Sequence, residues 1–405
     1  MPYHTRRRCL KGIGAAGAVV FAGCASDGGD GGGGSDGSDG NDGSDGSDGS
    51  DGSGDGDDGG STDSGQQESY KINLVSPSTK WQEEYLVYNL NGTFTGGHGW
   101  KGNLERESDG AFEVEIFRGG ELGTGQDLAT KIQQGEVQIG KISLANMSPF
   151  APIADLINLP FYLGRHTDPW DLTQAWFDLT SSSPWQEQVD AKIQEEGFRP
   201  IYWTGGPARS LLATDSVGAV PQPSDMEGVT HRTPGSQILS DMWSALGANP
   251  TNIAWAETPQ ALQEGVAQTL HVGLPGFLFG FQDVISDISM TNIVQDDITF
   301  AMSTQWYNDL PSELQRAVDR AVNKTKTEFV EYLPTAAQRM RTYIFDNDTE
   351  IHELSEDQID QFAEVISWEK SMWNNYKQEF AGSNEEARQL RKGLEHDSKY
   401  QIPDF

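Results

Sequence analysis

Cysteine is almost absent from this 405-residue sequence, which contains only Cys9 and Cys24. Both lie at the very start of the chain, so everything after position 24 is free of cysteine. A disulfide, a thiolate nucleophile and a cysteine-ligated metal are therefore excluded from the body of the protein. The roughly 335 residues after position 69 are long enough to form two domains and to bury a sizeable core without such links.

Basic residues are also scarce, with 28 Lys and Arg against 61 Asp and Glu and a formal net charge of −33. Segment 1–23 carries four basic residues and segment 25–67 carries twelve Asp, which leaves −25 for the remainder. No basic stripe can neutralise phosphates, which excludes nucleic acid as a partner. Dispersed acidity with few lysines is typical of proteins that stay soluble in concentrated salt. We therefore expect a halophilic, archaeal source; an acidic partner-binding surface is the alternative.

The apolar run near the N-terminus, residues 13–22, is much shorter than the roughly 20 residues needed to span a bilayer. It follows a basic segment and precedes Phe21-Ala22-Gly23-Cys24, which is the arrangement of a secretory signal. We expect segment 1–23 to be an export signal peptide. Its arginines resemble a twin-arginine signal, and its end resembles a lipobox, which implies a lipid on Cys24. The alternative is an ordinary secretory signal with an incidental cysteine.

The segment 24–69 consists almost entirely of Asp, Gly and Ser after Cys24. It lacks the periodic apolar residue that would let Asp-Gly repeats stack into a calcium-binding roll. Because it has nothing to bury, we expect a disordered tether whose ends are roughly 35–40 Å apart on average.

The pattern after Tyr70 alternates short strands with helices, which predicts an α/β fold with largely parallel sheets. We expect two lobes, 70–204 and 205–293, with segment 294–405 returning as a strand, a long helix and C-terminal helices shared by both lobes. The expected strands are 72–75, 111–118, 137–140, 198–203, 209–213 and 229–232. The expected helices are 81–89, 127–134, 236–246 and 311–333.

Catalytic and metal-binding motifs are missing. The seven histidines show no His-x-x-x-His spacing. After position 69 no Gly-x-Ser-x-Gly elbow is present, and no Gly-x-Gly-x-x-Gly loop directly follows an expected strand. We therefore expect no enzyme activity, no metal and no cofactor. Four Asn-x-Ser/Thr sites leave a glycosylated surface protein as a further alternative: Asn91, Asn146, Asn323 and Asn347.

A series of short motifs resembles the substrate-binding proteins of TRAP (tripartite ATP-independent periplasmic) transporters. Three lie in the first expected lobe and the others follow in the family's order between positions 70 and 335. They are Gly120-Glu121-Leu122-Gly123, 131–139, Leu156-Ile157-Asn158-Leu159-Pro160-Phe161, 226–234, Ala245-Leu246-Gly247-Ala248-Asn249-Pro250, 261–266 and 310–315.

The resemblance implies a periplasmic-binding-protein-like fold with a ligand cleft between two lobes. It implies a solute-binding protein that captures a small organic anion and delivers it to an ion-coupled permease. With the lipid on Cys24, the protein would be anchored at the extracellular face of the cell membrane. The alternative is a tethered receptor that serves a signalling partner without transport.

The resemblance also implies site residues. Arg232 stands where the family has an arginine that pairs with the ligand carboxylate, and a planar guanidinium suits that role. Arg209 is the nearest match to a second basic residue, and Trp255 to an aromatic residue of the cleft. Glu257 would orient a ligand hydroxyl or hold Arg232. Structural ion pairs are the alternative for both arginines, and core packing is the alternative for Trp255.

The segment 267–275 departs from the family pattern. The family usually has an acidic pair soon after Gly265-Val266, whereas this chain continues with Ala267-Gln268 and has no acidic residue up to position 275. A carboxylate pair or cation site in this loop is therefore not expected. His271 lies here and would donate a hydrogen bond to the ligand, or else be a structural histidine.

Overall fold

The computed structural model describes residues 69–83, 90–91, 97–203 and 207–403. The signal peptide expected at 1–23, Cys24 and nearly all of the tether expected at 24–69 lie outside these residues. The contacts below all belong to one compact unit, Gly65–Phe405. Within the described ranges, no helix combines the length and the apolar character needed to cross a bilayer.

The first sheet has five strands in the order β2-β1-β3-β10-β4. The edge strand β2 alternates in burial as its sequence alternates in polarity. Phe112 and Val114 are buried, whereas Glu113 and Glu115 are exposed. β1, β2 and β3 run parallel, and β10 runs antiparallel to both β3 and β4. The strands are β1 Tyr70–Val75, β2 Phe112–Phe117, β3 Ile139–Ser143, β4 Phe198–Ile201 and β10 Ile298–Ser303.

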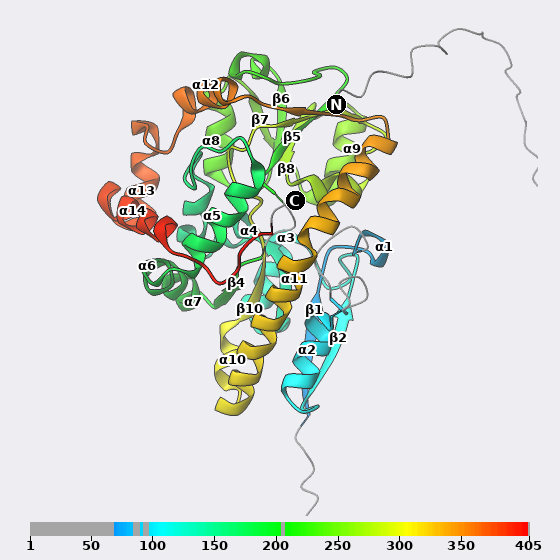
Figure 1. Ribbon diagram of the computed structural model, residues 1–405, viewed down its shortest axis with the longest axis vertical. Coiled ribbons are helices and arrows are strands. Elements are labelled where there is room, and N and C mark those ends of the chain that lie inside the picture. The colour runs from blue at the N-terminus through cyan, green and yellow to red at the C-terminus, as the bar shows by residue number, and fades with distance from the viewer. Residues whose placement is uncertain (1–68, 84–89, 92–96, 204–206, 404–405) are drawn as a thin grey trace, which may run out of the picture. The chain divides into compact units, whose positions relative to one another are not determined.

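The second sheet has six strands in the order β11-β9-β5-β8-β6-β7, and only β5 runs against its neighbours. The expected α/β class is confirmed, and each largely parallel sheet contains one reversed strand. The strands are β5 Ser210–Thr214, β6 Thr230–Thr233, β7 Asn249–Asn252, β8 Thr269–Val272, β9 Ile285–Met290 and β11 Glu350–Glu353. We call the parts built on the first and second sheets the first and second lobes (Figure 1).

The helices flank the two sheets. α8 begins after Ser236, whose hydroxyl accepts a hydrogen bond from the Leu239 amide, a normal N-cap. The helices are α1 Lys80–Glu83, α2 Gly99–Glu107, α3 Gly125–Gln133, α4 Leu144–Met147, α5 Pro169–Ser181, α6 Ser183–Trp185, α7 Ala191–Glu195, α8 Gln237–Ala245, α9 Thr258–Gln263, α10 Thr304–Asp309, α11 Ser312–Asp346, α12 Glu356–Ile366, α13 Asn374–Ala381 and α14 Asn384–Leu390.

Several predicted boundaries move. The helix expected to end at Leu333 continues to Asp346 with Pro334 inside it. Its apolar stripe continues beyond the proline through the buried Met340 and Ile344, so tertiary packing outweighs the lost backbone donor. The strand expected at 137–140 is shifted to β3, and most of the helix expected at 81–89 lies outside the described residues.

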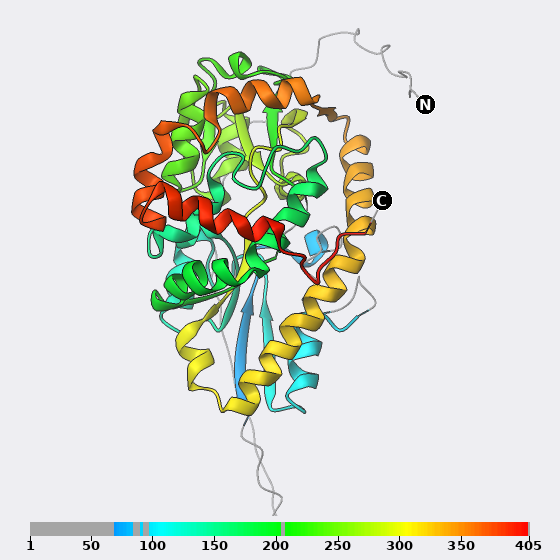
Figure 2. The ribbon, with the colours of Figure 1, turned by 60° about the vertical axis from the view of Figure 1, so that its left-hand side comes forward.

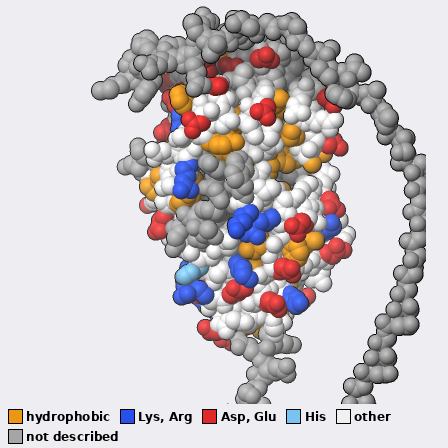
Figure 3. Space-filling view, turned by 90° about the vertical axis from the view of Figure 1, so that its right-hand side faces the viewer, with side chains coloured by type: hydrophobic (Ala, Val, Ile, Leu, Met, Phe, Trp, Pro, Cys, Tyr) orange, Lys and Arg blue, Asp and Glu red, His pale blue; other side chains and the backbone are white. Residues whose placement is uncertain are grey.

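Helix α11 contacts elements of both lobes (Figure 2). Glu107, at the end of α2, accepts hydrogen bonds from Arg320 at 2.8 Å and from Lys324, both on α11. Basic and acidic side chains alternate over the face that includes these helices (Figure 3). On this face Arg320 and Lys324 therefore share one carboxylate.

The chain crosses between the lobes from β4 to β5 and returns from β9 to β10. The two crossing segments touch, because the Arg209 amide donates to the Val294 carbonyl at 2.9 Å. In the returning segment, Asp297 is fully buried and forms a salt bridge with Arg209. Asp297 also accepts from the Ser143 hydroxyl at 2.7 Å and from Asn158 Nδ2 at 2.9 Å. This carboxylate therefore ties both crossing segments to the first lobe.

We expect Asp297→Ala to lower the free energy of unfolding by about 3–5 kcal/mol, because it leaves a buried guanidinium without its main counter-ion. Denaturant unfolding monitored by circular dichroism measures this change. The control is Asp360→Ala, which removes an exposed ion pair with Arg165 at 3.2 Å and should cost less than about 1 kcal/mol. Equal losses for the two variants would contradict the assigned role of Asp297.

Candidate functional site

A cavity of about 420 Å³ is lined by residues of both lobes and of the crossing segments. The second lobe contributes Arg232, Trp255 and His271, and the crossing segments contribute Arg209 and Asp296. Four of the five residues predicted from the sequence therefore meet at one cavity. Its volume suits a small molecule.

Arg232 is held at the cavity by its backbone and by one side-chain hydrogen bond. It lies on β6 and is only 7 % exposed, and its Nε donates to the Ile253 carbonyl at 3.0 Å. Its guanidinium carbon lies 5.3 Å from the ring centroid of Trp255, a cation–π contact. Among the described residues, no carboxylate forms a salt bridge with it.

The electrostatic state of Arg232 follows from this burial. Desolvation, and then the nearby charge of Arg209, lowers the pKa of Arg232 to about 9. The guanidinium therefore stays charged at neutral pH but has lost water without gaining an anion. Such a group binds an incoming carboxylate strongly, because charge-assisted hydrogen bonds are strong where water is excluded.

Arg209 also lines the cavity, but its charge is already compensated. It contacts Asp297 and lies 3.5 Å from Asp296, measured from Nε to Oδ1. Burial alone would lower the pKa of Arg209, but these two carboxylates more than offset that effect and raise it. Asp155, fully buried, adds a further negative charge nearby. Arg209 is thus the centre of a buried ionic cluster.

Trp255 and Glu257 lie in the same short turn but have different surroundings. Trp255 lines the cavity and makes edge contacts with Phe279 at 5.2 Å and Phe281 at 5.5 Å between ring centroids. Glu257 is exposed, lies outside the cavity lining and precedes the first residue of α9. It is therefore not brought together with Arg232.

His271, on β8, is buried at the edge of the cavity, 4 % exposed. Its Nε2 lies 3.3 Å from the Thr291 hydroxyl, and its ring makes an edge contact with Trp243 at 5.1 Å. Burial, and then the charge of Arg209, lowers the pKa of His271 well below its usual value. The imidazole is therefore neutral at pH 7.

The comparison with known families decides the relationship. Residues 91–378, well over half of the chain, match the family described as bacterial extracellular solute-binding protein, family 7 (DctP). The chain belongs to this family. Because the family consists of solute-binding proteins, membership agrees with the expectation that the chain is not an enzyme.

Relatives support the same family 7 assignment. A solute-binding protein of Sulfitobacter sp. (strain NAS-14.1) is 27% identical over 217 residues, which cover 53% of this chain and 63% of the relative. The match thus spans less than two thirds of that protein's length. The ectoine-binding periplasmic protein TeaA of Halomonas elongata is 21% identical over 300 residues, covering 72% of this chain and 84% of TeaA.

Solved structures share the fold of this family 7 chain. A TRAP periplasmic solute-binding protein from Sulfitobacter sp. NAS-14.1, with bound β-D-galacturonate, aligns with a TM-score of 0.67 and 18% identity over 80% of this chain and 99% of that one. One from Shewanella oneidensis, with bound succinate, has a TM-score of 0.68 and 16% identity over 80% and 99%. The expected two-lobe binding-protein fold and the resemblance to TRAP binding proteins are confirmed.

Sequence reasoning missed several residues that line the cavity. Lys141 lies on β3 and lines the cavity, 4 % exposed. A lone lysine inside an apolar strand of a lysine-poor chain is the signal that could have found it. Asn146 also lines the cavity, although the sequence suggested it as a glycosylation site; a bulky glycan there would occupy the cavity.

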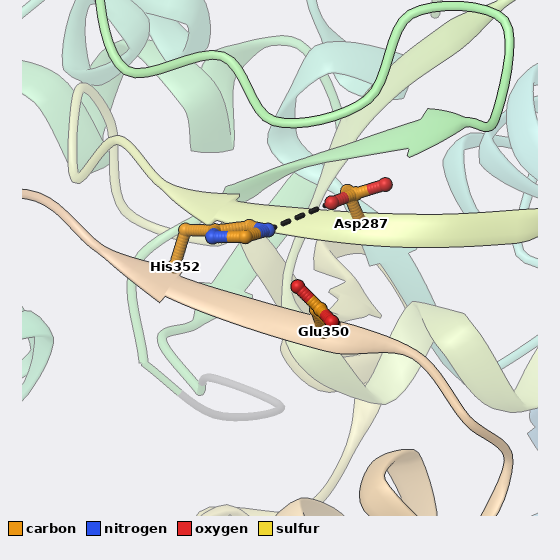
Figure 4. A group of neighbouring side chains, drawn as sticks. All are labelled: Asp287, Glu350 and His352. Atoms are coloured by element: carbon orange, nitrogen blue, oxygen red, sulfur yellow. Dashed lines mark hydrogen bonds and ion pairs between the residues drawn. The ribbon is translucent and has the colours of Figure 1, made fainter. Parts of the chain in front are cut away.

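A separate group of candidate metal ligands lies at the edge of the second sheet (Figure 4). Ligand atoms of Asp287, Glu350 and His352 lie within 4.8 Å of one another. Residue spacing in the sequence could not reveal this group, because its members lie on two different strands, β9 and β11. Asp287 is already satisfied by His352 at 2.7 Å and by the Ser286 hydroxyl at 2.6 Å. These contacts account for the group as a cross-strand pairing.

We expect His271→Gln to change the pH dependence of stability. The folded-state pKa of His271 is lowered, so the unfolded chain binds a proton that the folded one excludes once the pH falls below about 6.5. The wild type should then lose about 1.4 kcal/mol per pH unit relative to the variant, until the folded-state pKa is reached.

Denaturant unfolding of both proteins between pH 5 and pH 8 (roughly the histidine range) measures this difference. The buried Asp155 and Asp296 titrate in the same range, since burial raises the pKa of each to about 6, but they are common to both proteins and cancel. His98→Gln, at an exposed histidine, is the matched control. Parallel curves for wild type and His271→Gln would contradict the prediction.

Proposed function

We propose that this protein is an extracytoplasmic solute-binding protein that captures a small organic anion and delivers it to an ion-coupled TRAP-type permease. The observation that carries the proposal is Arg232, a buried charged guanidinium at the cavity. Among the described residues, its side chain makes a hydrogen bond only to the Ile253 carbonyl. A ligand carboxylate would supply the missing anion. Trp255 would exclude water from that ion pair and so strengthen it.

The proposed mechanism is closure of the two lobes around the ligand. The division at 204 and 293 is supported by the strands, because β10 returns to the first sheet while β11 joins the second. The Ser236 hydroxyl donates to Asp155 Oδ2 at 2.7 Å, and Gln82 Nε2 donates to the Leu278 carbonyl at 3.2 Å. These contacts between lobes hold the closed arrangement, and a ligand that binds it preferentially would shift the equilibrium toward it.

We expect Arg232→Ala to weaken carboxylate binding about 100-fold or more, because it removes a bidentate, charge-assisted pairing. Isothermal titration with D-glucuronate, D-gluconate and succinate at high salt measures the affinity. Arg232→Lys should restore part of it, since an ammonium keeps the charge but loses the planar fork. Arg165→Ala, at an exposed arginine, is the matched control. Unchanged binding by Arg232→Ala would overturn the carboxylate clamp.

Delivery to a permease is tested in cells. We propose that the uptake of a radiolabelled acid that the protein binds requires both this chain and a neighbouring multi-spanning permease gene. Loss of uptake in either deletion supports transport. Normal uptake without the permease, together with an adjacent sensor kinase gene, supports the signalling alternative instead.

We further propose that Cys24 carries lipid and anchors the protein at the extracellular face of the membrane, and that the −25 charge of the body suits a halophilic, archaeal environment. Cys24→Ala should move the protein from the membrane to the soluble fraction, because the acyl chains provide the anchoring energy. Cys9→Ala is the matched control, since Cys9 leaves with the signal. Membrane retention of Cys24→Ala would contradict lipid anchoring.

A further inference from the structure

The cations that line the cavity differ in whether carboxylates or hydroxyls of the protein already interact with their charge. Arg209 is compensated by Asp297 and Asp296. Lys141 donates to the Ser78 hydroxyl at 3.3 Å, lies 5.7 Å from the ring centroid of Phe279, and interacts electrostatically with Asp296. Among the described lining residues, Arg232 alone is a cation without a carboxylate or hydroxyl partner in the protein.

From this difference we infer that the ligand carries a single carboxylate and an uncharged, hydroxylated remainder. The inference rests on the proposed function and narrows it from organic anions in general to hydroxylated monocarboxylates. One free guanidinium calls for one anion. A second carboxylate would have to compete for Lys141 or Arg209 with groups of the protein that already hold them.

The negative charges beside the cavity oppose a second carboxylate. Asp296 lines the cavity, and Asp155 and Asp297 lie in the same buried cluster around Arg209. A cavity of 420 Å³ is only about 9 Å across if it is taken as a sphere, so both ends of any ligand lie within about 10 Å of Asp296, which is one Debye length at about 0.1 M salt. Salt screens buried charges much less than exposed ones, so the repulsion would persist at high ionic strength.

The first lobe presents neutral polar groups to the cavity. Thr124, Gln126 and Asn146, all from the first lobe, line it, and no hydrogen bond from their side chains to another described residue is assigned. Hydroxyl and amide groups both donate and accept, which matches the hydroxyls of a sugar acid. Phe279 and Ile142 add apolar surface to the lining.

The test compares acids that share a carbon skeleton and differ in the second carboxylate. D-gluconate and D-glucarate form one pair, and 4-hydroxybutyrate and succinate form another. We expect each monocarboxylate to bind the full mature chain at least tenfold more tightly than its diacid, as measured by titration calorimetry at constant high salt. A diacid that binds as tightly as its partner would overturn the inference.

The outcomes separate this inference from the proposed function. If diacids bind equally well and Arg232→Ala abolishes their binding, the solute-binding role stands and the single-carboxylate inference falls. If no acid binds, or if Arg232→Ala binds them unchanged, both fall. Asp296→Asn should reduce the preference for D-gluconate over D-glucarate at least threefold, whereas Asp360→Asn at the surface should leave it unchanged. An unchanged preference in folded Asp296→Asn would also overturn the inference. If that variant does not fold, the comparison of each monocarboxylate with its diacid on the wild-type protein decides the inference.

Discussion

The buried salt bridge between Arg209 and Asp297 is the constraint on which the rest of this structure depends. It joins the two segments where the chain leaves the first lobe and where it returns. Asp297 then extends the link into the first lobe through Ser143 and Asn158. Because a buried ion pair is costly to desolvate and costly to break, its value lies in fixing one arrangement of the crossing segments rather than in added stability.

That constraint determines the charge of the cavity. Arg209 lines the cavity, yet Asp296 and Asp297 already compensate its charge, and it holds the crossing segments together. Arg232 comes from a strand outside this cluster and keeps its charge available. Two arginines in one cavity thus have different roles, because neighbouring carboxylates reach only one of them.

Local sequence patterns predicted strands β1 to β6 and helices α3, α8 and most of α11, because alternating and helical apolar spacing reports directly on burial. They gave no range for β7, β8, β9 or β11. Arg232 and Trp255 could be identified from motif position alone. Asp297 could not, since its partners Arg209 and Ser143 are 88 and 154 residues away and no local pattern reports such pairings. Glu257 was expected at the cavity because it is two residues from Trp255 in the sequence. The turn places Trp255 in the cavity lining and leaves Glu257 exposed to solvent, which sequence proximity alone could not predict.

The distribution of functional groups makes ligand binding depend on both lobes. The free guanidinium and the aromatic ring belong to the second lobe, and the unoccupied hydroxyl and amide groups belong to the first. Neither lobe alone offers both the charge and the neutral hydrogen-bonding wall, so a ligand gains its full interaction energy only when the lobes are closed. The ionic cluster ties the crossing segments to the first lobe. Under the proposed function, a single carboxylate at the second lobe and a few hydroxyls at the first would together stabilise the closed state.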